Sequence, residues 1–373
     1  MTNSLPTFSL DTTTLLTSIP GLLGFLPERS LVVLAFDASA SIAVTARHDL
    51  LLDGEGRPTD QMRATLMSIA SVCAREGIVA TAVAIVDDRY DLPSRVYRTM
   101  LELTDAALTE AGVPGGVRAG FVVERFESGR PWYTAWWGLD GAGPADRDPE
   151  VPDAMGLDDA GFGCGLLGDP QSSPVALERS LHTGRVVMAS RAEMTDSLGP
   201  VEHCTDAACG GRPRAMRESR SPAGDAKLLR AALKVVTAPQ APAMTCTTVH
   251  TLSRAVSNLR VRDALLVVGA GEHRLVAEAV WRDLTRRTRG TVRASAATML
   301  AHLYYLGGEG ACAGVALDVA LDACDSWKLA TLLNSALCHG VHPSMMREIL
   351  SESYAVAAGL GVALPPLGRP RPV

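Results

Sequence analysis

Two nearly continuous apolar runs, at residues 30–37 and 80–86, limit the folds that this chain can adopt. A strand that is apolar on both faces must be covered on both faces, which is typical of a sheet with helices packed against it. Residues 41–50 alternate between apolar and polar side chains and follow the first run closely, so the two segments predict a β-hairpin. Pro27 cannot donate a hydrogen bond to a sheet, so we expect the first strand to begin after it.

Segments with helical spacing separate these strands, and glycines stand where two of the helices should end, at Gly77 and Gly112. Because parallel strands need helical crossovers, the pattern predicts one mixed sheet carrying helices, an α/β domain over residues 1–138. The predicted order is α-β-β-α-β-α-β-β, with helices at 12–18, 59–76 and 94–111 and strands at 30–37, 41–50, 80–86, 117–127 and 130–137.

The remainder of the chain divides into a polar stretch and a helical one. Residues 139–222 are rich in Gly, Asp and Pro without a sustained period, which predicts an excursion and linker. Within this stretch we expect two short helices, at 174–183 and 191–198, and a short strand at 185–188. Residues 223–373 have helical spacing almost throughout and predict a second, all-α domain.

One helical pair in this second domain has a recognisable spacing. Small and large apolar residues alternate in a way that resembles one tetratricopeptide repeat, in which small residues let two helices approach. The residues concerned are Leu300, Ala301 and Tyr304 on one helix and Ala313, Leu317 and Ala320 on the next. Only one clear copy is visible and a working solenoid needs about three, so a helical hairpin that serves as core is the alternative.

Composition excludes several classes of protein. Apolar residues at 47% and charged residues at 20% are ordinary for a soluble globular chain and exclude overall disorder. A net charge of −6 argues against a protein that binds nucleic acid with its whole surface. No apolar run is long enough to span a membrane, and the first residues lack a secretory signal. Eight scattered cysteines are expected to be reduced thiols, which predicts a cytoplasmic location.

Residues 19–36 read I-P-G-L-L-G-F-L-P-E-R-S-L-V-V-L-A-F. This stretch resembles the opening of the actinobacterial domain of unknown function (DUF) 4192 family, whose members begin with a similar P-x-L-L-G-F-x-P-x-x-S-L-V segment. That family has no established activity, so the resemblance implies kinship and no function. Many members also carry C-x-x-P-x-C-C-P-P after an aromatic strand, whereas residues 138–170 here hold only Cys164. Further matches are Arg47, Asp49, Trp132, Trp136, Trp137, Arg185, Arg191 and the block 261–341.

Polar residues at predicted strand ends are the first candidate site. They are Arg47, His48, Asp49, Asp87 and Asp88. In open α/β sheets ligands gather at such ends, and paired carboxylates with a histidine could bind a divalent metal or act as acid and base. The alternative is that Asp87 and Asp88 end a strand and cap a turn, as aspartates commonly do.

A second candidate site is a set of cysteines and histidines with the donor types that zinc prefers. The set comprises His203, Cys204, Cys209, Cys246 and His250. Cys246 and His250 are one helical turn apart and would share a face. Unrelated thiols in and beside a helical core would give the same count, so no cofactor is predicted and zinc is the only candidate.

Binding surfaces are predicted at two places. Strict alternation would put Trp132 and Trp136 on one face of their strand, and an exposed pair would form an interface or a stacking platform. Arg185 and Arg191 are binding candidates through the family resemblance. A dense basic run could contact nucleic acid, but solvated arginines at a helix end are the usual role of such a run. It comprises Arg282, Arg286, Arg287, Arg289 and Arg293.

Together these patterns favour a non-enzymatic, cytosolic binding or scaffold protein that contacts a protein partner through its helical domain and its aromatic strand. The competing hypothesis is a metal-assisted hydrolase whose site lies at the strand ends of the α/β domain. We expect neither nucleic acid nor a membrane as a partner. The sequence leaves the oligomeric state open.

Overall fold

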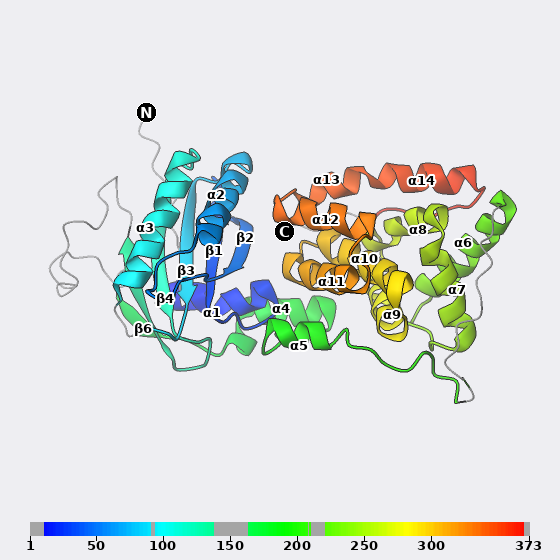
Figure 1. The fold of residues 1–373 in the computed structure, drawn as a ribbon, viewed down its shortest axis with the longest axis horizontal. Helices are drawn as coiled ribbons and strands as arrows, with labels where there is room; N and C mark the ends of the chain where they lie inside the picture. The colour runs from blue at the N-terminus through cyan, green and yellow to red at the C-terminus, as the bar shows by residue number, and fades with distance from the viewer. Residues whose placement is uncertain (1–10, 91–93, 138–162, 208, 210–220, 369–373) are drawn as a thin grey trace. The chain divides into compact units, whose positions relative to one another are not determined.

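The computed structural model describes residues 11–90, 94–137, 163–207, 209 and 221–368. The chain divides into two compact units, Met1–Arg191 and Ala192–Val373. The first unit is a mixed sheet with helices and the second is helical, as the sequence predicts (Figure 1).

Six strands form the sheet of the first unit, in the order β2-β1-β3-β4-β5-β6. The first strand lies between β2 and β3 and is antiparallel to both, while β3 and β4 form a parallel pair. Two helices, α2 (Asp60–Arg75) and α3 (Arg95–Glu110), provide the crossovers that β2–β3 and β3–β4 require. The strands are β1 (Ser30–Phe36), β2 (Ile42–Asp49), β3 (Ala80–Val86), β4 (Val117–Val123), β5 (Pro131–Trp137) and β6 (Cys164–Leu166).

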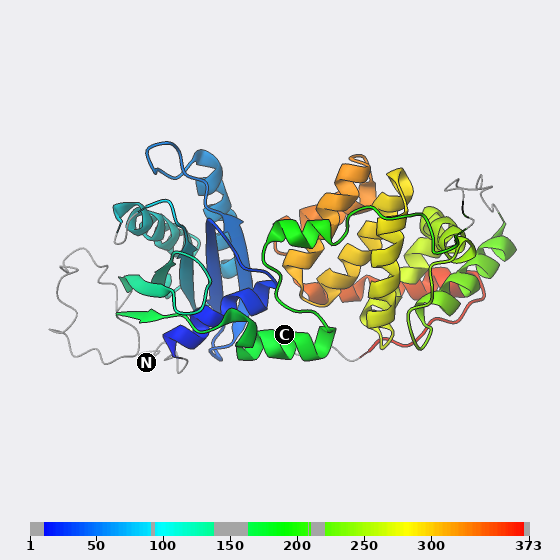
Figure 2. The ribbon, with the colours of Figure 1, turned by 90° about the horizontal axis from the view of Figure 1, so that it is seen from below.

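Both faces of the sheet are covered, which explains the continuous apolar runs. All residues of β1 and β3 are buried. Helices α2 and α3 cover one face, where Met62, Met100 and Leu101 meet strand residues such as Val33 and Val83. The other face carries α1 (Thr12–Leu23), and α4 (Pro174–Thr183) packs on α1 in turn (Figure 2). Gly21 permits this close approach, because a Cβ there would lie 2.7 Å from the backbone nitrogen of Ala176.

Helix α1 is longer than the predicted helix at 12–18. It runs on to Leu23 and contains Pro20, which cannot donate to the carbonyl of Leu16. The helix continues because Leu16, Ile19 and Leu23 are all buried, and this packing outweighs the missing hydrogen bond. It ends at Gly24, whose φ of 85° lets its N–H bond to the Pro20 carbonyl.

The segment predicted as a linker differs from expectation in three places. It supplies β6, which pairs antiparallel with β5 and extends the sheet. The expected strand at 185–188 is a single bridge, between Met188 and Phe25. The expected helix at 191–198 is α5 (Arg191–Asp196), because the Leu198 N–H bonds to the Thr195 carbonyl in a tighter turn.

The second unit is a set of packed helices. Helices α10 and α11 form its centre, with the predicted small and large residues from Leu300 to Ala320 buried between them. Its helices are α6 (Pro222–Val236), α7 (Cys246–Ser257), α8 (Leu259–Leu265), α9 (Arg274–Arg287), α10 (Gly290–Leu306), α11 (Gly310–Ala323), α12 (Lys328–Cys338), α13 (Pro343–Glu348) and α14 (Leu350–Gly359).

A buried histidine in α10 makes the stability of this unit dependent on pH. Burial lowers the pKa of His302 from 6.5 to about 4. As the pH falls below 6.5, the unfolded chain takes up a proton that the folded chain refuses, so stability falls until the pH reaches about 4. We expect His302 to account for a loss of about 3 kcal/mol over that range, at 1.36 kcal/mol per pKa unit.

Denaturant unfolding from pH 7 to pH 4, followed in α10 by hydrogen exchange, checks this expectation. His302→Leu should remove that part of the pH dependence, whereas His339→Gln, at an exposed position, should leave it unchanged. An equal pH slope in the wild type and His302→Leu would contradict it.

Candidate functional site

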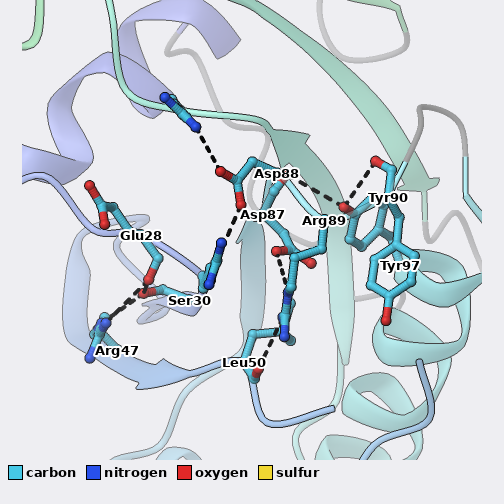
Figure 3. A network of polar contacts seen from close by, with 11 residues as sticks. Glu28, Ser30, Arg47, Leu50, Asp87, Asp88, Arg89, Tyr90 and Tyr97 are labelled. Carbon is cyan, nitrogen blue, oxygen red and sulfur yellow. Dashed lines mark hydrogen bonds and ion pairs between the residues drawn. The ribbon is translucent and has the colours of Figure 1, made fainter. Parts of the chain in front are cut away.

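The predicted strand-end residues do come to one end of the sheet. Ser30 begins β1 and pairs with Asp49 on one side and with Val86 on the other. Asp87 and Asp88 follow Val86 directly, so their carboxylates lie at the edge where β2 also ends (Figure 3).

Asp88 is held between two arginines. Arg125 Nη2 lies 2.8 Å from one carboxylate oxygen and Arg29 Nε lies 3.2 Å from the other. Hydrogen bonds from Arg125 and then Arg29 lower the pKa of Asp88 below its ordinary value. Arg29 has a φ of 43°, a left-handed conformation that non-glycine residues rarely adopt. The pair of ion contacts therefore fixes the start of β1 to the segments that follow β3 and β4.

Asp87 is buried and pairs with a single arginine. Arg89 Nε donates to Asp87 Oδ1 at 2.7 Å, and Arg89 Nη2 donates to the Leu50 carbonyl at 3.1 Å. The second carboxylate oxygen, Oδ2, is buried without a hydrogen-bond partner among the described residues. The Tyr97 hydroxyl donates to the Asp87 carbonyl at 3.4 Å, and burial raises the pKa of Tyr97. This ion pair, with the side chain of Asp87 buried and that of Arg89 half-buried, joins the end of β3 to the chain after β2.

Arg47 contacts the segment that precedes β1. Its guanidinium pairs with Asp49 at 2.7 Å, donates to Ser30 Oγ at 2.9 Å and lies over the Phe25 ring. Burial lowers its pKa, and the positive charge of Arg191 contributes in the same direction, so these two predicted residues are electrostatic neighbours.

His48 does not join this cluster. As the strand neighbour of Arg47 it points to the opposite face of the sheet, where its Nε2 lies 3.5 Å from Thr65 Oγ1 of α2. Its Nδ1 donates to the Asp49 carbonyl at 3.0 Å. The imidazole and the carboxylates thus lie on opposite faces of the sheet. The sequence prediction grouped them by position along the chain and did not consider this alternation.

The arrangement is a network of ion pairs in which each predicted carboxylate already has an arginine partner. A hydrolytic metal centre instead needs carboxylate oxygens that converge on one open position. The partners Arg29, Arg89 and Arg125 were missed in the sequence, although each lies within three residues of a predicted strand end. Arginine beside aspartate at strand ends is the pattern that could have identified the network.

Trp132 and Trp136 are core residues, with exposed fractions of 7% and 6%. The Trp132 indole N–H donates to Thr13 Oγ1 of α1 at 3.1 Å, and the Trp136 indole N–H donates to the Val117 carbonyl at 3.0 Å. Neither ring forms the exposed platform that a binding role would require.

The prediction that these two tryptophans share a face is wrong. Phe121 pairs with Thr134, but the next residue along, Gly120, pairs with Trp136, so β5 has an extra residue at Ala135. Such a bulge reverses the alternation beyond it, and Trp136 joins the core under α2 and α3 while Trp132 faces α1. Glycine at position 120 leaves room for the Trp136 side chain, because a Cβ there would lie 2.8 Å from the Trp136 Cβ.

Arg185 and Arg191 lie at the two ends of a segment that runs beside the chain after α1. Arg185 follows the α4 cap Gly184 and is half-buried, and Arg191 begins α5. The segment between them is held by Met188, whose N–H donates to the Gly24 carbonyl at 2.9 Å. This segment therefore runs beside Gly24, within residues 19–36.

The cysteine and histidine cluster is brought together in the second unit. One donor atom each from His203, Cys204, Cys209 and Cys246 lies within 4.8 Å of all the others. His250 is not part of this group of four. The Cys246 sulfur lies 3.1 Å from that of Cys204 and 3.0 Å from that of Cys209, which in turn lies 3.4 Å from His203 Nδ1. Hydrogen bonds with Cys209 and then Cys204 raise the pKa of Cys246.

Residues 205 and 206 make further contacts with the start of α7 and with the residues just before it. Asp206 accepts a hydrogen bond from the Cys246 N–H at 2.6 Å, and its own N–H approaches the Cys204 sulfur at 3.4 Å. The Thr205 N–H donates to the Met244 carbonyl at 3.0 Å. The sequence analysis did not identify Asp206, although its position between Cys204 and Cys209 suggests that it would contact the groups around the thiols.

The basic run around α9 positions this loop. Arg293 donates to the Leu198 carbonyl at 3.0 Å and Arg287 to the Glu202 carbonyl at 3.0 Å. The Val201 N–H returns a hydrogen bond to the Arg286 carbonyl at 2.9 Å. These arginines thus have structural partners immediately before His203.

A family model described as "Domain of unknown function (DUF4192)" matches residues 13–344. No curated protein and no solved structure matches the chain. Across the described part of the chain, every helix is too short or too polar to cross a membrane.

Proposed function

Since the chain belongs to the DUF4192 family, described only as a domain of unknown function, we propose a function from its own residues: a non-catalytic binding or scaffold protein. It contacts a protein partner through the helical unit. The aromatic strand no longer contributes to this proposal, because Trp132 and Trp136 are buried.

The observation that carries the proposal is apolar surface on the consecutive helices α12 and α13. Helix α12 has four leucines, but Leu333 is the only one of them that is buried. Leu332 is 66% exposed, Met345 is 55% exposed and Ile349, directly after α13, is 57% exposed. Partly exposed methionines and leucines are typical of surfaces that accept helices of other proteins.

The arrangement of α10 and α11 supports a tetratricopeptide-like role. The two helices are joined by a short connection, residues 307–309. The pair buries the small residues Ala301 and Ala313 together with Tyr304. In helical repeat proteins the last helix of a stack needs a polar outer face unless another element covers it. An apolar α12 is therefore suited to receive an amphipathic helix from a partner.

We place the protein in the reducing cytoplasm, in keeping with eight cysteines that form no disulfide. The hydrolase remains the second candidate, favoured by one observation, the buried Asp87 Oδ2 without a partner. The ion pairs of Asp49, Asp87 and Asp88 with arginines weigh against it, since no carboxylate of the three lacks a cationic neighbour.

Capture of the full-length chain from native extract, after chemical crosslinking, tests the binding function. The triple variant Leu332→Gln, Met345→Gln, Ile349→Gln should lose at least about ten-fold of any partner that the wild type captures in near-stoichiometric amount, a loss of about 1.4 kcal/mol or more. Circular dichroism should be unchanged, because all three side chains are exposed.

The control variant Leu259→Gln, Leu275→Gln changes exposed leucines on α8 and α9 and should capture the partner normally. Equal capture by the triple variant, or no stoichiometric partner for the wild type, would contradict the proposal. Turnover of generic ester or phosphate substrates that depends on added divalent metal and is abolished by Asp87→Asn would instead support the hydrolase.

A further inference from the structure

The four donors at the start of α7 have the composition of a structural zinc site. Three thiols and one imidazole form the Cys₃His set, and His203, Cys204, Cys209 and Cys246 supply one donor atom each. We propose that the helical unit binds one Zn²⁺ ion through these four side chains.

The distances fit a single four-coordinate ion. Zinc bonds of about 2.0 Å to nitrogen and 2.3 Å to sulfur place tetrahedral ligands about 3.3 to 3.8 Å apart. The separations that join the four donors are 3.0, 3.1 and 3.4 Å, so small outward movements of the sulfurs would open the tetrahedron. Four protein ligands leave no position for water or substrate, and the site is therefore structural and not catalytic.

Two features beside the cluster favour thiolates and oppose the effect of the neighbouring thiols, which raise the pKa of Cys246. Cys246 is the first residue of α7, where the helix dipole stabilises negative charge. The Asp206 N–H points at the Cys204 sulfur, and the Asp206 carboxylate holds the Cys246 N–H. Such contacts beyond the ligands orient them in metal sites.

The site also has a clear mechanical consequence for the chain. Cys204 and Cys246 are 42 residues apart, so the ion would close a long loop that contains α6. Ligand residues 203 and 204 directly follow a stretch whose carbonyls are held by Arg286, Arg287 and Arg293 of the α9–α10 region. The zinc would thus complete the attachment of residues 198–209 to the helices.

Metal analysis of the full-length protein, purified through a tag without histidines and without chelator, tests the site. We expect about one zinc per chain, matching one four-ligand centre. Cys204→Ser, Cys209→Ser and Cys246→Ser should each release most of the metal, whereas Cys338→Ser, an exposed cysteine elsewhere in the unit, should retain it. Cobalt substitution should give the intense absorption of a tetrahedral thiolate complex.

The fourth ligand is tested by comparing two histidine variants. His203→Ala should weaken zinc binding at least about ten-fold, and His250→Ala should weaken it less. The reverse order would overturn this ligand set. Zinc-free wild-type protein, or a mass that is lower by two hydrogens with two cluster thiols resistant to alkylation, would overturn the zinc site itself, the latter in favour of a disulfide.

A stability measurement separates loss of the ion from general misfolding. Chelation of the wild type should speed hydrogen exchange in residues 203–207 and in the first turn of α7, while β1 and β3 of the first unit exchange as before. Unchanged exchange around Cys246 after complete zinc removal would overturn the structural role.

Discussion

Replacing Arg89 with alanine is expected to lower the free energy of unfolding of the first unit by about 3–5 kcal/mol. Arg89 is the ion-pair partner of Asp87, whose side chain is fully buried, and the pair is 2.7 Å apart. Removing the guanidinium leaves a buried carboxylate without a counter-charge, and that carboxylate already has one oxygen without a partner. The Leu50 carbonyl loses its donor as well.

Hydrogen exchange of β1 and β3 amides, measured in urea on the full chain, gives the opening free energy of this unit. Arg125→Ala is the matched control, because it breaks an ion pair at the same end of the sheet with an arginine that is 51% exposed. We expect that control to cost much less than Arg89→Ala, because solvent screens an exposed ion pair. Asp87→Asn should restore part of the stability lost in Arg89→Ala, and an equal loss in the Arg89 and Arg125 variants would refute the buried-pair argument.

Trp136→Ala should destabilise the same unit by about 3–5 kcal/mol, as expected for a large aromatic side chain removed from a core. The indole is 6% exposed and packs with α2 and α3, and its N–H is bonded to the Val117 carbonyl. Trp136→Phe should cost less, because it keeps most of the packing and loses the hydrogen bond.

The opening free energy of β3 and β4, followed by hydrogen exchange, checks this ranking. Capture of a protein partner should be no weaker for Trp136→Phe than for the wild type, since the ring is not a surface residue. A Trp136→Ala protein that keeps its stability but loses a partner would show that the indole serves binding, as the sequence pattern alone predicts.

The division into an α/β unit and a helical unit could be predicted because each has a clear period in its apolar residues. Strand β3 and helix α4 were predicted with their observed bounds, since aspartate ends the first and serine and glycine cap the second. The end of α1 and the strand β6 could not be predicted. Pro20 inside a helix and a three-residue edge strand both depend on packing that no local pattern contains.

At the candidate sites, the sequence predicted which residues come near one another but not the directions in which their side chains point. The strand ends meet where expected, but Arg47 and His48 point to opposite faces and the carboxylates find arginines. In the thiol cluster, helical spacing favoured His250 as the partner of Cys246, whereas the loop brings His203 to it. Helical spacing could not reveal the histidine that joins the cluster, because the path of the chain before Cys204 depends on arginines more than 80 residues away.

The pairing of β5 with β6 has a consequence for engineering this chain. Strand β5 ends at Trp137, and the carbonyl of Gly163, just before β6, accepts a hydrogen bond from the Thr134 N–H at 2.9 Å. Both ends of the intervening stretch are thus fixed to neighbouring strands, and the cost of closing a loop rises only slowly with its length. A change in the length of the connection between β5 and β6 would therefore leave the register of these two strands unchanged.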